Sequence, residues 1–405
     1  MKIILILEYV IYLVSLCDAR LEQPFLSQHA LIWRYIGALL LIQVVIGCIF
    51  RFKPDGRRIL VPYITKYMAF ILIWMIQVFF DSGTDTDEFV VLLGFIVTIF
   101  LFGLQAARYR AVEELLTIGF IVPNVMLILN NIANEINVFE LLGQVNIASF
   151  FSSVYSQRVR FNLGIPNPNT LGNLVTCLLC ISLPLLAVQK MHKGGVQRIL
   201  SILLIGLDAF DFITLVDCGT RTGMACFLIC AFLFVFLIST QRQNNNSGAT
   251  RVIRVMSLVF IIVIAGLFIF DRFISAYIGG RHQSFELLGI LKGFQYISGV
   301  GVFSPGQASS LYGSHLDNYY IYLLITTGIV GLILYLLFFI RLFKDIRKYG
   351  DNAITYGVIC CFVADMLYGF GETSILYPMF PSAAIFMVLF IGYSIVGVEK
   401  EVDFS

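Results

Sequence analysis

The sequence predicts an all-α membrane protein, and its composition and the length of its apolar runs indicate this class. Of the 405 residues, 59% are hydrophobic and only 13% are charged, whereas soluble domains carry about 25% charged residues. A chain this apolar cannot cover its surface with polar groups, so lipid must be much of its solvent. Because unpaired backbone amides are costly in lipid, the apolar runs must be helices. Residues 1–405 are therefore predicted to form a single integral membrane domain, a polytopic helix bundle.

The apolar runs set the number of predicted spans. A helix needs roughly 20 residues to cross about 30 Å of hydrocarbon, and runs of about that length occur about twelve times in the sequence. The predicted spans lie near residues 3–17, 31–50, 61–80, 89–106, 111–130, 170–189, 196–216, 222–240, 252–270, 317–340, 353–370 and 379–397.

The basic residues predict the orientation of these spans. If the N-terminus is cytoplasmic, most of the 27 Lys and Arg residues face inward, in segments such as RFKPDGRR (51–58) and RLFKDIRK (341–348). Cytoplasmic loops of membrane proteins carry an excess of Lys and Arg, so both termini are predicted to be cytoplasmic. Two longer segments, 131–169 and 271–316, then form outer loops.

The cysteines do not predict a metal site. Most of the nine lie inside apolar runs, and Cys177 and Cys180 form a CxxC pair without a second pair or a nearby histidine. In lipid-embedded helices a cysteine is usually a small hydrophobic residue. No metal and no cofactor is predicted.

Three basic or titratable side chains are predicted on the outer side. They are Arg221 in VDCGTRTG, Arg281 in GGRHQSF and His315 in GSHLDNYY. Arginine pairs bidentately with phosphate, so two such groups suit a diphosphate. Each also has a simpler interpretation: Arg221 snorkels to the interface, Arg281 is a solvated loop residue, and His315 forms a hydrogen bond near a helix that Asp317 caps.

Two acidic residues accompany Arg221. Asp208 and Asp211 are spaced i,i+3 and so share one face of a helix. They suit binding of sugar hydroxyls or a cation, or service as a base. An ion pair that holds Arg221 in place explains them equally well.

Two segments predict outer turns. GIPNPNTLGN (164–173) predicts a rigid turn in which Asn169 or Thr170 caps the next helix, or in which helix-start amides face a polar headgroup. GVGVFSPG (299–306) predicts a flexible loop. It lacks the spacing of a nucleotide-binding phosphate loop.

Taken in order and spacing, four segments resemble the O-antigen polymerase and O-antigen ligase superfamily of bacterial envelope glycosyltransferases (Wzy and WaaL). They are PNPNTLGNL (166–174), GTRTG (219–223), Arg281 followed by GVGVF (299–303), and SHLDNYYIYLLITTGIVGLILYLLFF (314–339). The resemblance implies a metal-independent, inverting, GT-C-like transferase of the bacterial plasma (inner) membrane. It would join undecaprenyl-diphosphate-linked repeats into a capsule or O-antigen polysaccharide on the outer face.

The resemblance also implies roles for particular residues. Arg221 and Arg281 would bind the leaving diphosphate, and His315 would take the acceptor proton or orient the diphosphate. Two residues separate His315 from Asn318, where the family often has His-Asn adjacent, which leaves open whether His315 or Asp317 is the reactive group. The predicted substrate-binding residues are Asn169, Asp208, Asp211, Asp317, Asn318 and Tyr319.

The implied partners are lipid-linked glycans, the bilayer, a flippase and a chain-length regulator, with no nucleic acid. A ligase-type enzyme that transfers the glycan to a lipid or protein acceptor is an alternative. A lipid-linked oligosaccharide flippase and a scaffold protein are alternatives from other classes. A flippase needs charged groups along a cavity through the bilayer, whereas the charges here are predicted to gather outside.

Overall fold

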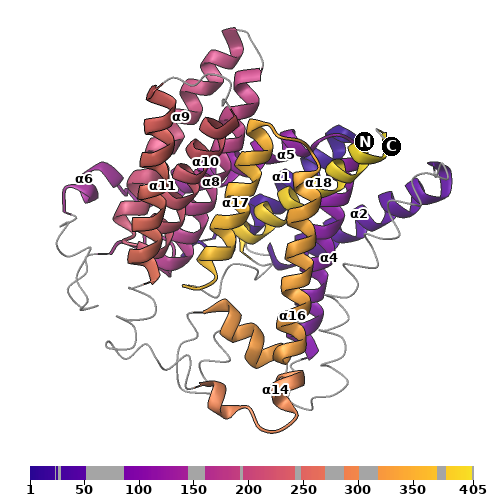
Figure 1. The fold of residues 1–405 in the computed structure, drawn as a ribbon. Coiled ribbons are helices and arrows are strands. Elements are labelled where there is room, and N and C mark those ends of the chain that lie inside the picture. The colour runs from indigo at the N-terminus through magenta and orange to yellow at the C-terminus, as the bar shows by residue number, and fades with distance from the viewer. Residues whose placement is uncertain are drawn as a thin grey trace.

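A computed structural model describes residues 1–22, 24–25, 29–51, 86–144, 160–191, 195–241, 248–269, 287–300, 318–371 and 380–403. These residues form helices and no strand (Figure 1). Every predicted span is occupied by a helix except 61–80, which lies outside the described residues. The all-α class predicted from the apolar runs is confirmed.

The described residues include thirteen α-helices and one 3-10 turn. In chain order they are α1 (Lys2–Asp18), α2 (His29–Arg51), α4 (Thr86–Arg108), α5 (Val112–Ala133), the short α6 (Val138–Leu142), α8 (Pro168–Met191), α9 (Gly195–Asp217), α10 (Arg221–Gln241), α11 (Gly248–Ile269), a 3-10 turn (Leu287–Ile290), the short α14 (Gln295–Ser298), α16 (Tyr319–Arg347), α17 (Ala353–Tyr368) and α18 (Pro381–Asp403).

Seven of the described helices are long and apolar enough to cross a membrane, namely α5, α8, α9, α10, α11, α16 and α18. Shorter apolar stretches lie in α2, α4 and α17. Two of the long helices contain an internal proline, Pro123 in α5 and Pro184 in α8. Membrane helices tolerate proline because neighbouring helices and side chains satisfy the freed backbone groups. The molecule is a membrane helix bundle.

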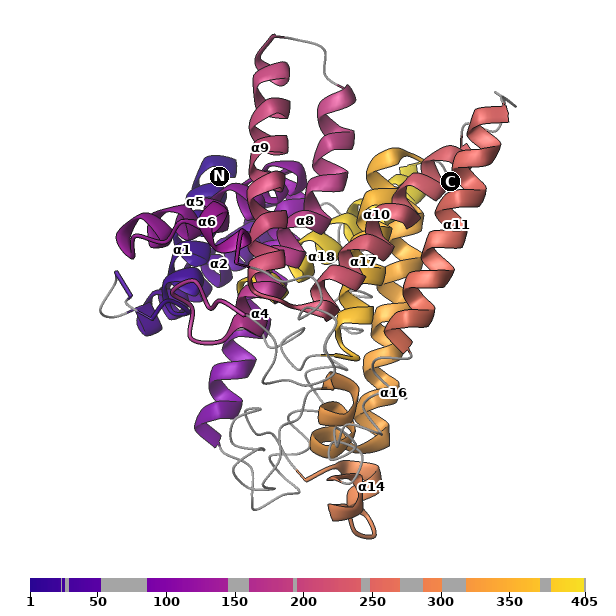
Figure 2. The ribbon, with the colours of Figure 1, turned by 90° about the vertical axis from the view of Figure 1, so that its left-hand side faces the viewer.

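The helices differ in how far the protein covers them. In α8 and α18, 83% of the apolar window is buried, whereas in α11 only 6% is buried. Helices α8 and α18 therefore form the centre of the bundle, and α11 lies at its edge against α10 (Figure 2). Eight of the nine cysteines are free and buried, as expected for small hydrophobic residues.

Both ends of the chain lie on the same side of the bundle (Figure 1). We call this side the termini face; it also carries the start of α5, where Lys2 pairs with Glu114 at 2.6 Å. We call the opposite side the far face; here α8 and α10 begin and α9 and α17 end (Figure 2).

Helix α16 is broken inside its length, at Gly328, whose φ is 64°. Gly299, with φ 78°, lies against this break, and a Cβ on either glycine would overlap backbone atoms of the other segment. The N–H of Val300 donates to the carbonyl oxygen of Ile325 at 2.8 Å, so the break leaves that carbonyl satisfied. The first two residues of the predicted flexible loop thus pack against α16, and its flexibility stays a prediction. The rest of 299–306 lies outside the described residues.

Candidate functional site at the far face

Arg221 lies at a tight turn on the far face. Helix α9 ends at Asp217 and α10 begins at Arg221. Gly219 lies between them with φ 62°, a left-handed conformation that glycine adopts without steric cost. The turn places Arg221 in the first turn of α10, where its side chain is half-buried.

The start of α8 packs directly against this turn. The hydroxyl of Thr220 donates to the carbonyl oxygen of Pro168 at 3.4 Å. A Cβ at Gly172 would overlap the side chain of Thr220, and a Cβ at Gly223 would overlap that of Thr176. Small residues let membrane helices approach closely. The segments PNTLGN and GTRTG, far apart in the sequence, are thus in contact.

Arg160 ties the two segments together, and sequence reasoning missed it. Its Nε donates to the carbonyl oxygen of Cys218 at 3.1 Å, and its Nη2 donates to the side-chain oxygen of Asn169. The adjacent N–H of Phe161 donates to the carbonyl oxygen of Asp217 at 3.1 Å. No motif marks Arg160. The available signal was its position in a predicted outer loop, where positive charge is scarce, just before a rigid turn.

Asn169 is held by three hydrogen bonds. Its side-chain oxygen accepts from Arg160, its carbonyl oxygen accepts from the hydroxyl of Tyr368 at 3.4 Å, and its N–H donates to Oδ1 of Asn167 at 2.8 Å. The prediction that Asn169 or Thr170 caps this helix is wrong. Pro168 starts the helix, because its fixed φ and missing N–H suit the first helical position. Asn167 is therefore the capping residue.

Asn318 caps α16. Its Oδ1 accepts from the N–H groups of Tyr320 and Ile321 at 3.0 and 3.2 Å, and its Nδ2 donates to the carbonyl oxygen of Phe370 at 3.3 Å. The prediction that Asp317 caps this helix is therefore wrong, because Asn318 is the capping residue. The contact with Phe370 joins the start of α16 to the end of α17.

Tyr319 lies in the aromatic core. It is 2% exposed, and its ring centroid lies 5.9 Å from that of Tyr322 and 5.7 Å from that of Tyr335. Its N–H donates to the carbonyl oxygen of Gly369 at 2.8 Å. Its ring packs against other rings in this structure, and its predicted contact with a sugar stays a prediction.

Asp208 and Asp211 lie deeper in the membrane than expected. Asp208 precedes Asp217 by nine residues, which is about 14 Å along a helix. Asp211 accepts from Nδ2 of Asn124 on α5 at 3.2 Å, and Asp208 interacts with Ser182 on α8. Among the described residues these are their polar partners. The ion pair between this acidic pair and Arg221 is therefore not formed, because Arg221 lies at the far face.

Three predicted site residues, Arg281, His315 and Asp317, lie outside the described residues. Their predicted roles stay predictions.

The thiol of Cys218, in the turn that precedes Arg221, is not activated. Burial raises the pKa of the Cys218 thiol to about 11, although the hydrogen bond with Thr220 and the positive charge of Arg160 act in the opposite direction. A thiol with this pKa is almost wholly protonated at neutral pH and is a poor nucleophile. Cys218 is a structural residue of the turn.

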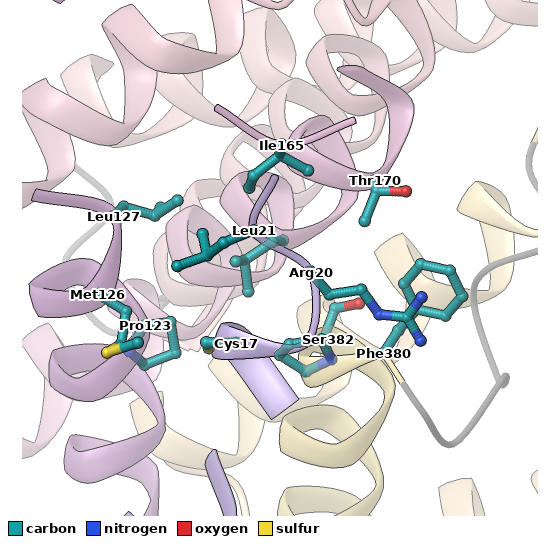
Figure 3. A pocket seen from close by; sticks show the side chains of 12 residues that line it. Cys17, Arg20, Leu21, Pro123, Met126, Leu127, Ile165, Thr170, Phe380 and Ser382 are labelled. Carbon is teal, nitrogen blue, oxygen red and sulfur yellow. The ribbon is translucent and has the colours of Figure 1, made fainter. Parts of the chain in front are cut away.

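A small pocket adjoins the start of α8 (Figure 3). Thr170 and Ser382 line it together with Arg20, whose guanidinium lies 4.2 Å from the centroid of the Phe380 ring. The rest of the lining is apolar and includes Leu21 and residues from α5. The far face therefore carries Arg20, Arg160 and Arg221 within its described part.

The sequence matches no model of a known protein family and no curated protein.

Proposed function

We propose that this protein joins lipid-diphosphate-linked sugar repeats into a polysaccharide at the outer face of a bacterial plasma membrane. In this proposal the far face is the outer face and both termini are cytoplasmic. The chain crosses the membrane about twelve times, in a GT-C-like arrangement. A flippase and a chain-length regulator are its proposed protein partners. A diphosphate carried on a lipid lies at headgroup depth, and the far face is one of the two sides of the bundle at which membrane-spanning helices begin or end.

One observation supports the proposal above others. The start of α8 and the α9–α10 turn carry two separate pieces of the family resemblance, and they are in direct contact, with Arg160 hydrogen bonded to both. A resemblance made of unrelated fragments would not require these segments to meet. Their contact fixes Arg221 at the first turn of a helix, where the backbone also favours anions.

In the proposed chemistry, the oxygen of the acceptor sugar hydroxyl bonds to the anomeric carbon of the donor sugar as the bond from that carbon to the diphosphate breaks. Arg221 and Arg281 would bind the diphosphate and stabilise the negative charge that develops as the sugar–phosphate bond breaks. His315, or Asp317 in its place, would accept the proton of the attacking sugar hydroxyl. The proton and the leaving diphosphate are then both accounted for without a metal.

Reconstitution tests this function. Purified protein in liposomes would receive a synthetic lipid-diphosphate-linked repeat on its outer face, and product length would be followed on a gel. We expect a ladder of polymers with the wild type and a large loss with Arg221→Lys, because an ammonium lacks the planar fork of guanidinium. Arg254→Lys is a matched control, since Arg254 donates to the carbonyl oxygen of Ser239 at 3.0 Å on the opposite face.

The acceptor distinguishes a polymerase from a ligase. A polymerase extends one lipid-linked repeat with another, whereas a ligase needs a lipid core or a protein acceptor. In a deletion strain, surface chains one repeat long would indicate a lost polymerase, and long unattached lipid-linked chains would indicate a lost ligase. Full activity of Arg221→Lys and of His315→Ala in the reconstituted system would refute the proposed chemistry.

A flippase is the second candidate, and the depth of Asp208 and Asp211 favours it. Transporters place charged residues inside the bilayer, and these two carboxyls lie in the middle of a span. The liposome assay separates the candidates: a flippase would move a labelled lipid-linked repeat between leaflets and would leave its length unchanged.

A further inference from the structure

Two carboxyl groups lie at the middle of a membrane span. Asp208 is the tenth residue of the 19-residue apolar window Ile199–Asp217 of α9. Asp211 follows one turn later, on the same face, and is fully buried. An ionisable side chain at this depth costs several kcal/mol unless it is neutralised, which makes a function the default hypothesis.

The polar atoms around these carboxyls are short of donors. Asn124 on α5 is fully buried and gives its Nδ2 hydrogens to Oδ2 of Asp211 at 3.2 Å and to the carbonyl oxygen of Phe120 at 3.1 Å. The remaining oxygens, Oδ1 of Asp208, of Asp211 and of Asn124, are buried and accept no hydrogen bond from the described residues. A buried acceptor without a donor costs about 1–3 kcal/mol.

Another buried aspartate, Asp345, differs from this pair because cationic side chains lie beside it. Asp345, whose side chain is 1% exposed, accepts from Nε of Arg341 at 2.8 Å and lies 3.5 Å from Nζ of Lys348. Within the described part of the chain, no lysine or arginine lies within ion-pair distance of Asp208 or Asp211. A cationic ligand would supply the positive charge that this part of the chain does not provide.

We propose that Asp208, Asp211 and Asn124 form an intramembrane binding site for a monovalent cation, either a proton or an alkali ion. Three side-chain oxygens from two helices provide the acceptors, and the cation supplies the missing positive charge. Calcium takes six to eight oxygens and magnesium keeps a near-octahedral shell with several waters, so a set of only three side-chain oxygens suits a monovalent cation better. This site is separate from the far face and does not rest on the proposed polymerase activity.

The other charged groups of the helices around the pair are few among the described residues. Cys177 on α8 lies within electrostatic range of Asp211, Glu140 on α6 is exposed, and Arg221 lies at the far end of α10. None of them is a cation beside the acidic pair. Two further buried carboxyls lie on neighbouring segments, Asp217 at the end of α9 and Asp365 on α17, so the asparagine variants of the pair identify which part of the pH response belongs to it.

Thermal unfolding of the full-length purified protein tests the site. Melting would be measured in choline chloride, then with sodium, lithium or potassium replacing choline at constant ionic strength, and again from pH 8 to pH 5. If an alkali ion binds, the melting temperature rises in a saturable way with that ion. If only a proton binds, the folded state holds more protons than the unfolded state, so stability rises as pH falls. The unfolding equilibrium then changes about tenfold per pH unit for each proton.

Two conservative variants and one control complete the experiment. Asp211→Asn and Asp208→Asn each remove one carboxylate and should abolish or strongly reduce the cation dependence and the excess pH dependence. Asp345→Asn should keep both dependences, because its own carboxyl is compensated by side chains. The proposal is overturned if the wild type responds to neither alkali ions nor pH, or if its response survives unchanged in either asparagine variant. Since the wild-type response is measured without any substitution, failure of one variant to fold does not prevent this outcome.

Discussion

Charged side chains are treated differently on the two sides of this bundle. On the termini face, Asp345 pairs with Arg341 and Lys348, and Lys2 pairs with Glu114. On the way to the far face, Asp208 and Asp211 have no cationic partner among the described residues. One buried carboxylate oxygen in each of these three aspartates accepts no hydrogen bond from the described part of the chain, so the difference between them lies in the neighbouring cations.

The contacts between segments also differ in part. On the termini face, Lys2 of α1 pairs with Glu114 of α5, while the pairs of Asp345 with Arg341 and Lys348 lie within α16. Close approach occurs on both sides, at Gly397 against the backbone of Asp345 and at Gly172 against the side chain of Thr220. The far half adds a helix break packed against a second glycine and the hydrogen bonds of Arg160 to a carbonyl and an amide. Exposed ion pairs contribute little and tolerate change, whereas close approach tolerates almost none.

The largest expected loss of stability comes from a substitution at Gly328, at the break of α16 in the far half. Gly328→Ala must adopt a φ of 64° and places a Cβ over the backbone of Ile297, so we expect a loss of about 3 kcal/mol or more in the free energy of unfolding. Gly206→Ala is the matched control. Gly206 is exposed within α9, and no atom lies within 4 Å of the place that a Cβ would take, so alanine should stabilise by about 0.5–1 kcal/mol. Equal melting temperatures for the two variants would contradict the description of the break.

The second effect concerns function at the far face. Arg221→Lys should lower polymer formation by about 100-fold, which corresponds to about 2.7 kcal/mol of lost transition-state stabilisation, while the melting temperature changes little. Arg254→Lys on the termini face should stay within about twofold of wild type. Rates of repeat addition in liposomes, with melting curves of the same samples, measure both. A similar loss in both variants would mean that the two faces do not differ in this respect.

The third effect is a difference between two buried aspartates in how their replacement changes the free energy of unfolding. Asp345→Asn should lower the free energy of unfolding by about 1–2 kcal/mol, since Arg341 and Lys348 lose an acceptor but still reach water. Asp211→Asn, measured in choline chloride, should leave stability equal or higher because an uncompensated charge is removed. Chemical or thermal unfolding in one detergent gives both values. A loss at Asp211 as large as that at Asp345 would show that Asp211 has a compensating partner.

The smallest effect belongs to the exposed ion pair. The side chains of Lys2 and Glu114 are 41% and 44% exposed, so Lys2→Ala should cost about 0.2–1 kcal/mol. The loss should shrink further in high salt because exposed charges are screened. A cost above that of Asp345→Asn would reverse the ranking.

The positions of the helices could be predicted from the sequence, but the side chains that cap their ends could not. Apolar runs located every described long helix, because length and hydropathy dominate in lipid. Caps were misplaced: at the start of α8, Pro168 fixes the first helical residue, and at the start of α16 the side chain of Asn318 reaches the free N–H groups. Boundary chemistry of this kind depends on which side chain reaches the backbone, which spacing alone does not determine.

The site was only partly predictable for a related reason. The segments around Asn169 and Arg221 were singled out as loose motifs, and their contact emerges from the small residues Gly172 and Gly223. Arg160 could not be found, because it acts through carbonyl and amide oxygens from two distant segments. Asp208 was grouped with Arg221 as a possible ion-pair partner, although nine residues of helix separate it from Asp217, where α9 ends.

The two glycines at the break of α16 have an evolutionary consequence. Gly299 and Gly328 lie 29 positions apart in the sequence, yet each leaves room for the backbone of the other segment. A side chain gained at one position removes the reason for a glycine at the other. Among descendants of a common ancestor, we therefore expect positions 299 and 328 to change together.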